Sequence, residues 1–492
     1  MRKSFSSQLR LDCNPIESVE LNIESRHEMI PVLASLQQVY ADPNLRFSVT
    51  ELIGLDLNAT TRRDIGREGF SDWQVVVLAA VRLGCNLDYD QLQDLAENHR
   101  SLRGVLGIGD WDQSTHFGWR RIRDTLCMIR PDTLQKLNHV IVSYGQELHG
   151  DARREVRADS FVIETNIHYP TESSLIWDGV KKMIPLCVAL ALDLGELGWR
   201  QAEQLKRRIK EKARVISQIS ASRSPKAKEG LPKAYGNLLE RTDELIRRAK
   251  ALKTKGDEEC SLPSTIKRVQ QLQVWIELTE QVCDTARRRA LLGESVPNTE
   301  KLFSLFETHT QLYRRGKAGT PNQFGRLVLV FEDAAGFISH YNIMHRDAQD
   351  KDVIVEQTQI AQTQIAQTNH GGEIEKASFD RGFYAPENEE KLSLIIASPC
   401  LPPRHPKQYA EKLEEASIEF RTSRQRHPGI ESAINALQTG NGLKRCRDRS
   451  ELGLERYIGL AILGRNLHAL GKLLIARQNG ESNAAISKRI AA

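Results

Sequence analysis

Apolar residues recur at helical spacing along most of the chain. The first clear helix begins after Ser71, which can cap it together with Gln74. The next apolar residues fall on one helical face: Trp73, Val76, Val77, Ala80 and Val81. Three more helices are expected, one from about Asp88, one over 114–129 and one after Pro131. This part of the chain is therefore predicted to be a helical domain.

Segments typical of strands occur in two separate blocks. The first is 156–165, which alternates and is rich in β-branched residues. The second contains a hairpin at 326–344 that turns at 334–336, and a short strand that ends at 377–379. Between the blocks, the chain from 199 to about 292 is helical and charged. The simplest arrangement is one α/β sheet domain interrupted by a helical insertion.

A five-residue unit, TQIAQ, occurs twice in tandem from 358 to 367 and is expected to form the C-terminal part of a helix. Five extra residues lengthen a helix by about 7.5 Å and rotate its remaining residues by roughly 140°. Ile360 and Ile365 therefore cannot face the same spot on a sheet. We expect the repeat to project past the sheet edge, with the loop at 369–372 taking up the extra length.

Composition places the chain among soluble globular proteins of the cytoplasm. Its 492 residues are 40% hydrophobic and 27% charged, without an apolar run of membrane-spanning length or the apolar core of a signal peptide. The eight cysteines are scattered and form no CxxC pair, so neither a zinc site nor a disulfide framework is indicated. We expect a cytoplasmic, nucleoid-associated protein with no membrane partner.

Positive charge is concentrated in the middle of the chain. The formal net charge is only +5, but residues 200–255 contain 17 Lys and Arg against 6 Asp and Glu. A stretch of this kind attracts polyanions, and nucleic acid is the usual partner. The alternative is a solvated helical face without a partner.

Three carboxylates are placed where they could share a metal ion. Asp159 lies within the first predicted strand, Asp380 follows a later strand, and Glu431 lies in a helix that opens after Pro428. A carboxylate at the end of a buried strand needs a cation or several donors to offset its desolvation. Three such groups would form an open, oxygen-rich site of the kind that Mg²⁺ prefers.

Three blocks of sequence resemble the catalytic blocks of bacterial insertion-sequence DDE transposases, in the family's order. They are DSFVIETNIHYPTESSLIWDG (159–179), SFDRGFY (378–384) and HPGIESAINALQTGNGLKRCRDR (427–449). The segment ERYIGLAILGRNLHALGKLL (455–474) resembles the final helix of that group. The resemblance extends over roughly 153–477, and the helical region at about 62–150 is more loosely similar to their N-terminal domain.

The resemblance implies an α/β, ribonuclease-H-like mixed sheet with a helical N-terminal domain and a helical insertion. Asp159, Asp380 and Glu431 would be catalytic and would bind two Mg²⁺ ions, with Mn²⁺ as a substitute. The expected activity is cutting of double-stranded DNA at the element ends and joining of those ends to target DNA, by a homodimer. In chain order, the implied parts are an extension 1–60, a DNA-binding domain 61–150, a catalytic domain 151–198 and 320–478, a basic insertion 199–319, and a tail 479–492.

Basic side chains in three places are candidates for binding DNA: Arg120 and Arg121, then Arg207, Arg208 and Lys210, then Arg424 and Arg426. Many relatives carry Tyr, Arg and Lys at fixed offsets around the catalytic Glu. The corresponding positions hold Arg424, His427 and Gln438, so that signature is absent here. Two alternatives remain open, an inactive or repurposed DNA-binding protein derived from a transposase and a nuclease of the same fold.

Overall fold

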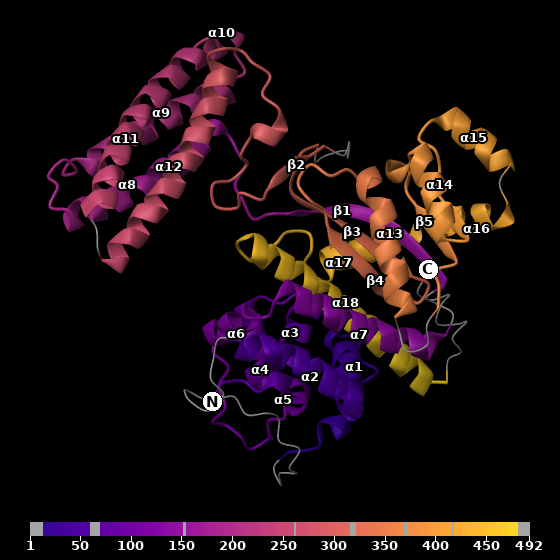
Figure 1. The fold of residues 1–492 in the computed structure, drawn as a ribbon. Coiled ribbons are helices and arrows are strands. Elements are labelled where there is room, and N and C mark those ends of the chain that lie inside the picture. Colours follow the sequence, from indigo (N-terminus) through magenta and orange to yellow (C-terminus); the bar gives the residue numbers. More distant parts are fainter. Residues whose placement is uncertain are drawn as a thin grey trace. The chain divides into compact units, whose positions relative to one another are not determined.

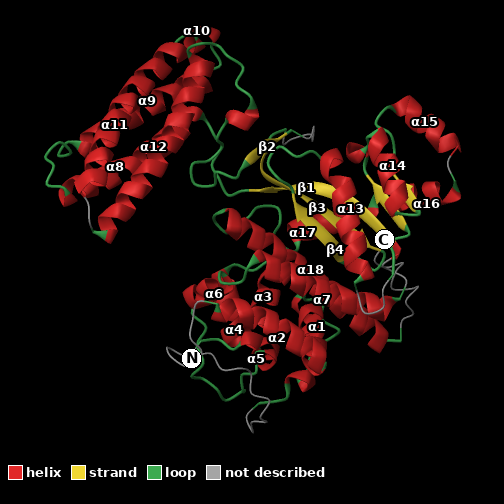
Figure 2. Cartoon of the chain, in the orientation of Figure 1, coloured by secondary structure: helices red, strands yellow, loops and turns green. Residues whose placement is uncertain are grey.

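The structure, a computed structural model, describes residues 13–59, 69–150, 154–259, 262–314, 321–367, 372–415 and 417–480. It is a mixed α/β fold (Figures 1 and 2). The chain divides into two compact units, one made of Met1–Glu164 with Arg326–Ala492 and the other of Thr165–Gly325. Both units have a hydrophobic core of their own.

The sheet of the first unit is built around β1 (Glu155–Glu164), which lies between β3 (Gln323–Asp333) and β5 (Lys376–Phe379). β5 runs parallel both to β1 and to β6 (Ser398–Cys400). β3 and β4 (Ile338–Ile343) form the predicted hairpin. Its turn is stabilised by the Asp333 carboxylate, which accepts hydrogen bonds from the backbone N–H groups of Ala335 and Phe337 at 3.0 Å each.

Seven helices precede the sheet in the described N-terminal part of the chain. They are α1 (Met29–Ala41), α2 (Pro43–Asn58), α3 (Asp72–Gly84), α4 (Tyr89–Asn98), α5 (Arg100–Val105), α6 (Trp119–Leu126) and α7 (Pro131–His149). The predicted helix starts at α3, α4 and α7 are confirmed, and both Ser71 and Asp88 form capping boxes. α1 and α2 were not predicted, although Asp42 caps α2 ahead of a proline in its first turn.

The helix expected over 114–129 is shorter in the structure, because a turn replaces its first part. The Asp112 carboxylate accepts hydrogen bonds from the backbone N–H groups of Ser114 and Thr115, at 2.9 and 3.1 Å, and from both hydroxyls. Such local bonds compete with helix formation. α6 therefore begins only at Trp119, whose N–H donates to the Gln93 side chain at 2.8 Å.

The last helix, α18 (Glu451–Gln478), is the central helix of the first unit and packs against α1, α3 and α7 (Figure 1). Among the described residues it is the one helix long and apolar enough to span a membrane, but 67% of that stretch is buried inside the protein. Glycines allow its neighbours to come close. A Cβ on Gly464 would lie 2.4 Å from the backbone N of Gly84, and one on Gly471 would lie 1.7 Å from the carbonyl O of Pro31.

The N-terminal helices and the sheet share one core rather than forming separate domains. The buried Asn466 side chain of α18 accepts a hydrogen bond from the Ile338 N–H at 2.8 Å and donates to Asn138 of α7 at 3.1 Å. A single hydrophobic cluster includes residues of α1, α3, α7, α18, β1 and β3. The boundary expected near 150 is therefore not a boundary between compact units.

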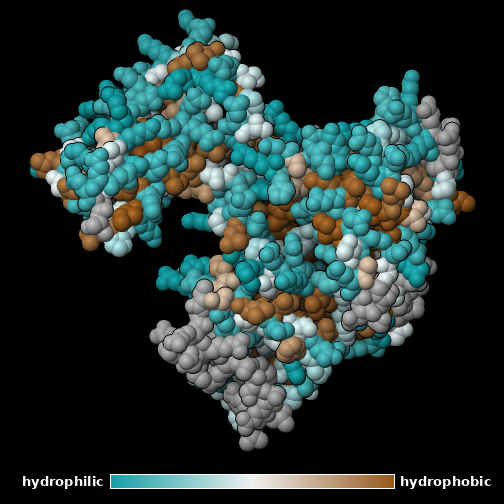
Figure 3. All heavy atoms as spheres, in the orientation of Figure 1, coloured by the Kyte–Doolittle hydropathy of each residue, from teal (hydrophilic) through white to brown (hydrophobic). Residues whose placement is uncertain are grey.

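The second unit is mainly helical, and its surface on the face drawn in Figure 3 is largely hydrophilic. Its elements are α8 (Glu172–Asp193), α9 (Ala202–Ala221), α10 (Pro225–Lys228), α11 (Leu231–Glu259), α12 (Pro263–Ala290), a 3₁₀ turn at Asn298–Glu300 and the short strand β2 (Gln311–Tyr313). The unit begins earlier than the predicted insertion at 199–319, because α8 packs on α9, α11 and α12 through buried residues such as Ile176 and Leu190.

The TQIAQ repeat lies in α13 (Asp350–Ala366), and the prediction that it projects past the sheet is wrong. Ala361 and Ile365 are buried, while Ile360 is the exposed isoleucine of the pair. The Gln364 side chain lies 3.1 Å from the ring of His340 on β4, and the Gln362 side chain accepts a hydrogen bond from the Ile374 N–H at 2.8 Å. The expected loop at 369–372 lies mostly outside the described residues.

The 3₁₀ turn at Ile16–Ser18 contacts α1 and α5. The remaining short elements of the first unit follow β5 in the chain: a 3₁₀ turn at Arg381–Phe383, α14 (Pro386–Ile395), α15 (Pro406–Glu415), α16 (Ile418–Arg426) and α17 (Gly429–Thr439). The helix predicted after Pro428 is thus confirmed as α17. α16 contacts β5 and β6, whereas α17 contacts β1.

Candidate active site

Asp159 and Asp380 lie side by side on neighbouring strands. β1 and β5 are parallel, and Ala158 is the register partner of Phe379. The residue after each is an aspartate, so the two backbone positions lie one strand spacing, about 4.8 Å, apart and both side chains leave the same face of the sheet. Both residues are partly buried. The structure thus brings together two of the three acids that the sequence singled out.

The two carboxylates differ in their protein contacts. An Asp159 carboxylate oxygen accepts a hydrogen bond from the Ser160 N–H at 2.7 Å. The carboxylate of Asp380, by contrast, forms no hydrogen bond or ion pair with the described residues, although Asp380 precedes a 3₁₀ turn that it could have capped. A half-buried carboxylate without a partner costs free energy, so its position favours an external cation.

The loop that follows Asp380 is fixed by contacts with several elements. The Asn388 side chain donates to the carbonyl of Phe383 at 3.1 Å and to that of Lys351 at 2.7 Å. Arg404 donates to the carbonyl of Gly382 at 2.6 Å. These bonds hold Asp380 at the end of β5 without using its carboxylate.

Arg157 connects β1 to the start of α17. Its guanidinium donates to the carbonyl of Arg426 at 3.1 Å and to the buried carboxylate of Glu332 on β3 at 2.7 Å. Gly429 leaves room for it, since a Cβ there would lie 1.9 Å from an Arg157 guanidinium nitrogen. Arg157 therefore determines how closely the first turn of α17 approaches β1. Burial raises the pKa of Glu332, and the positive charge of Arg157 opposes that rise.

His427 connects the same turn to β5. Its Nδ1 lies 3.1 Å from the hydroxyl of Ser378, the register partner of Arg157. Burial, together with the charges of Arg424 and Arg157, lowers the pKa of His427 to about 4, and Asp380 opposes this shift. The imidazole is thus neutral at physiological pH. The contacts of His427 and Arg157 therefore hold the α16–α17 turn next to Ser378 on β5 and Arg157 on β1. Each of these strand residues lies two positions before an aspartate of the pair.

Glu431 lies in the first turn of α17, two residues beyond Gly429, just as Asp159 lies two residues beyond Arg157. Its side chain is exposed. In the described residues, no three His, Cys, Asp or Glu side chains lie close enough together to hold one metal ion. The aspartate pair fits a divalent cation by donor type, and Glu431 lies on the adjoining helix with an exposed side chain.

The candidate DNA-binding residues lie in different surroundings. Arg120 and Arg121 are exposed on α6, and their guanidinium groups lie over the rings of Trp119 at 4.9 Å and Phe70 at 4.2 Å. Arg426 forms an ion pair with Glu155 at 2.8 Å, and Arg424 is partly buried beside His427. The three basic residues of the insertion are exposed on one helix, α9: Arg207, Arg208 and Lys210.

Four residues around the aspartate pair were not identified from the sequence as a group: Arg157, Glu332, His427 and Gly429. Their contacts join β1, β3 and the α16–α17 turn, which are separated by more than 90 positions along the chain. No local spacing signals such contacts. The glycine directly before the apolar face of α17 was the one local feature that could have suggested a close approach.

Comparison of the chain with models of known protein families, with curated proteins and with solved structures found no match in any of the three.

Proposed function

We propose that this protein is a DNA transposase of the DDE type, with a ribonuclease-H-like catalytic fold. The observation that carries the proposal is the pair formed by Asp159 and Asp380 at the ends of parallel strands, with a carboxylate on Asp380 that no described residue neutralises. The sheet order β3-β1-β5-β6, with β4 beside β3, and the carboxylate-bearing helix α17 against β1 are consistent with it.

Asp159 and Asp380 would hold Mg²⁺, and Glu431 would complete the site by turning its side chain towards them. Bound divalent ions would activate the attacking oxygen and stabilise the leaving oxygen in an in-line displacement at phosphorus. The protein itself would position the three carboxylates. The register of β1 and β5 sets the distance between the aspartates, and Arg157 and His427 set the position of the α17 turn.

The proposal can be tested with purified protein, Mg²⁺ and a supercoiled plasmid that carries the DNA flanking the coding region. We expect strand cleavage at the two flanks and joining of the released 3′ ends to a second plasmid, neither of which should occur in EDTA. Cleavage without joining would identify a nuclease of the same fold. Binding of the flanks without Mg²⁺-dependent cleavage would identify a repurposed DNA-binding protein.

Gly429→Ala should reduce Mg²⁺-dependent cleavage by roughly 10- to 100-fold while leaving DNA binding unchanged. The added methyl group would overlap Arg157, so either the guanidinium or the start of α17 must move, and Glu431 moves with the helix. A misplacement of about 1 Å can cost 100-fold in rate. Ser432→Ala is the matched control, because Ser432 is exposed on the same helix. Equal activity of Gly429→Ala and Ser432→Ala would contradict this positioning role.

Replacing Arg207, Arg208 and Lys210 of α9 by Gln should weaken DNA binding and make it less dependent on salt. Each phosphate contact that is lost should reduce the slope of log K against log salt by about 0.9. A triple Gln variant at Lys250, Lys253 and Lys255 removes the same charge from α11 and is the control, since these lysines pair with Glu280, Asp257 and Glu196. Identical slopes for both variants would show that α9 is only a solvated face.

A further inference from the structure

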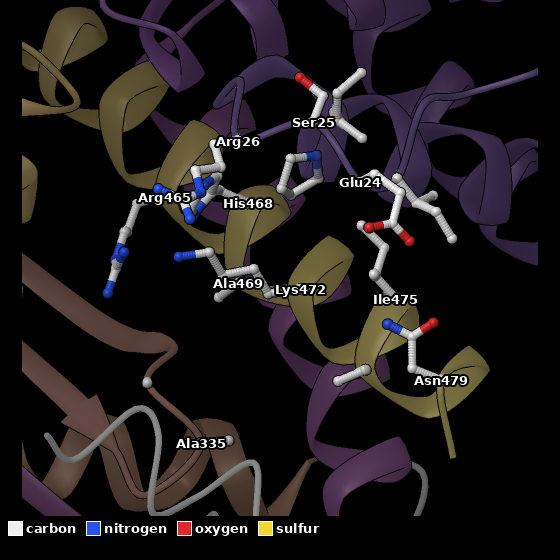
Figure 4. A pocket seen from close by; sticks show the side chains of 15 residues that line it. Glu24, Ser25, Arg26, Ala335, Arg465, His468, Ala469, Lys472, Ile475 and Asn479 are labelled. Atoms are coloured by element: carbon white, nitrogen blue, oxygen red, sulfur yellow. The ribbon is translucent and has the colours of Figure 1, made fainter. Parts of the chain in front are cut away.

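A cavity of about 480 Å³ lies in the first unit, away from the aspartate pair. It is enclosed by residues 23–31, by the hairpin turn at Ala335 and Gly336, and by the C-terminal half of α18. Its volume is within the range of roughly 300–1,000 Å³ that is typical of small-molecule sites. Figure 4 shows the lining side chains of α18 together with those of the N-terminal segment, and Ala335 of the hairpin turn.

One side of the cavity is cationic. Arg465, His468 and Lys472 project from α18, and Arg26 of the N-terminal segment lies beside them in Figure 4. Burial and the neighbouring charges lower the pKa of His468 to about 3, so its ring is neutral at physiological pH and offers a hydrogen bond without charge. Among the described residues, three cations therefore line the cavity, against the one carboxylate of Glu24.

Arg465 is the cation that carries the strongest signal for a bound anion. Its Nε is buried and has no hydrogen-bond acceptor among the described residues. The carboxylate that stabilises its positive charge is that of Glu332. Arg157 already forms an ion pair with Glu332 at 2.7 Å. A guanidinium with a buried donor that has no acceptor is costly, and a bound anion would reduce that cost.

Much of the remaining lining is apolar, so the ligand needs an apolar portion as well as an anionic one. The apolar lining residues are Ile23, Ile30, Pro31, Ala469, Ile475 and Ala476. We propose that this cavity binds a small organic phosphate, with its phosphate among Arg26, Arg465 and Lys472 and its apolar body against the aliphatic side chains. A phosphate dianion suits three separated cations better than a monoanionic carboxylate does.

Fluorescence titration of the full chain with 1-naphthyl phosphate tests the proposal, with inorganic phosphate and 1-naphthol as separate probes of the head and the body. We expect saturable binding of 1-naphthyl phosphate, at least tenfold weaker binding of inorganic phosphate and weaker binding still of 1-naphthol. Arg26→Gln and Lys472→Gln should each weaken 1-naphthyl phosphate binding by about tenfold. Both residues are exposed at the cavity, so these variants should fold normally, which thermal unfolding verifies.

Lys136→Gln is the matched control, because Lys136 is exposed on α7 and does not line the cavity. Its affinity for 1-naphthyl phosphate should equal that of the parent chain. Affinity that is unchanged in both Arg26→Gln and Lys472→Gln would overturn the proposal. The proposal would also be overturned if a 30-base-pair DNA duplex displaced 1-naphthyl phosphate at duplex concentrations that saturate DNA binding. That result would identify the cavity as a contact for DNA phosphates. This test involves no catalysis and is independent of the proposed transposase activity.

Discussion

Asp380→Asn protein should bind DNA as tightly as the parent chain but cleave and join it at least about 1,000-fold more slowly, a loss of roughly 4 kcal/mol in transition-state stabilisation. Asparagine keeps the shape of the side chain and removes the negative charge that attracts Mg²⁺. The carboxylate has no hydrogen bond or ion pair with the described residues, so its loss should not weaken the fold. The measurements are plasmid cleavage in Mg²⁺ and DNA binding in EDTA.

A second measurement separates metal binding from activity. Mg²⁺ should raise the thermal unfolding midpoint of the parent chain, because a ligand that binds only the folded state stabilises it. The shift should disappear in Asp380→Asn and Asp159→Asn. Metal-free Asp380→Asn should be at least as stable as the parent, since two adjacent like charges become one. Glu419→Gln, which removes a carboxylate from α16, is the control. Normal joining by Asp380→Asn would refute the assignment.

Gly471→Ala should lower the free energy of unfolding by about 2 kcal/mol or more, and the unfolding midpoint by roughly 4 °C or more. Ordinarily this substitution within a helix gains about 1 kcal/mol. Here the new Cβ would lie 1.7 Å from the Pro31 carbonyl oxygen. Backbone atoms cannot move aside as the end of a flexible side chain can, so α1 and α18 would have to separate.

Gly453→Ala in the same helix is the control for that substitution. Its Cβ would lie 3.4 Å from the nearest atom, the Ser450 hydroxyl, which is an ordinary contact. We expect this variant to be as stable as the parent chain or slightly more stable. If thermal or urea unfolding gave the same result for both alanines, the close crossing of α1 and α18 would not be a determinant of stability.

Local patterns predicted those elements whose signals lie within a few residues. Ser71 and Asp88 began helices as capping residues, and the 334–336 turn joined two strands. Asp380 was placed directly after a strand, and Glu431 in the first turn of a helix, because both segments have clear boundaries. These placements are the part of the candidate site that a single sequence could provide.

Features that depend on distant partners were not predicted. The TQIAQ repeat looks dispensable as a sequence, yet two of its glutamines bond to groups on other segments. α8 was assigned to the sheet domain, although its buried face packs against the helices of the insertion. The close approach of the Arg157 guanidinium to Gly429 joins residues that are 272 positions apart in the sequence. Neither the secondary-structure propensity of a segment nor its hydrophobic periodicity indicates which distant element it will contact.

The central position of α18 has a consequence for synthesis of the chain. α1, α3 and α7 emerge from the ribosome with apolar faces that are covered only when residues 451–478 appear, about 300 positions after α7 ends. At roughly 5–20 residues per second this interval lasts on the order of tens of seconds. The helical unit, which has its own core, can fold during that time. Nascent chains that stop before residue 451 should therefore be the form of this protein that most requires chaperones.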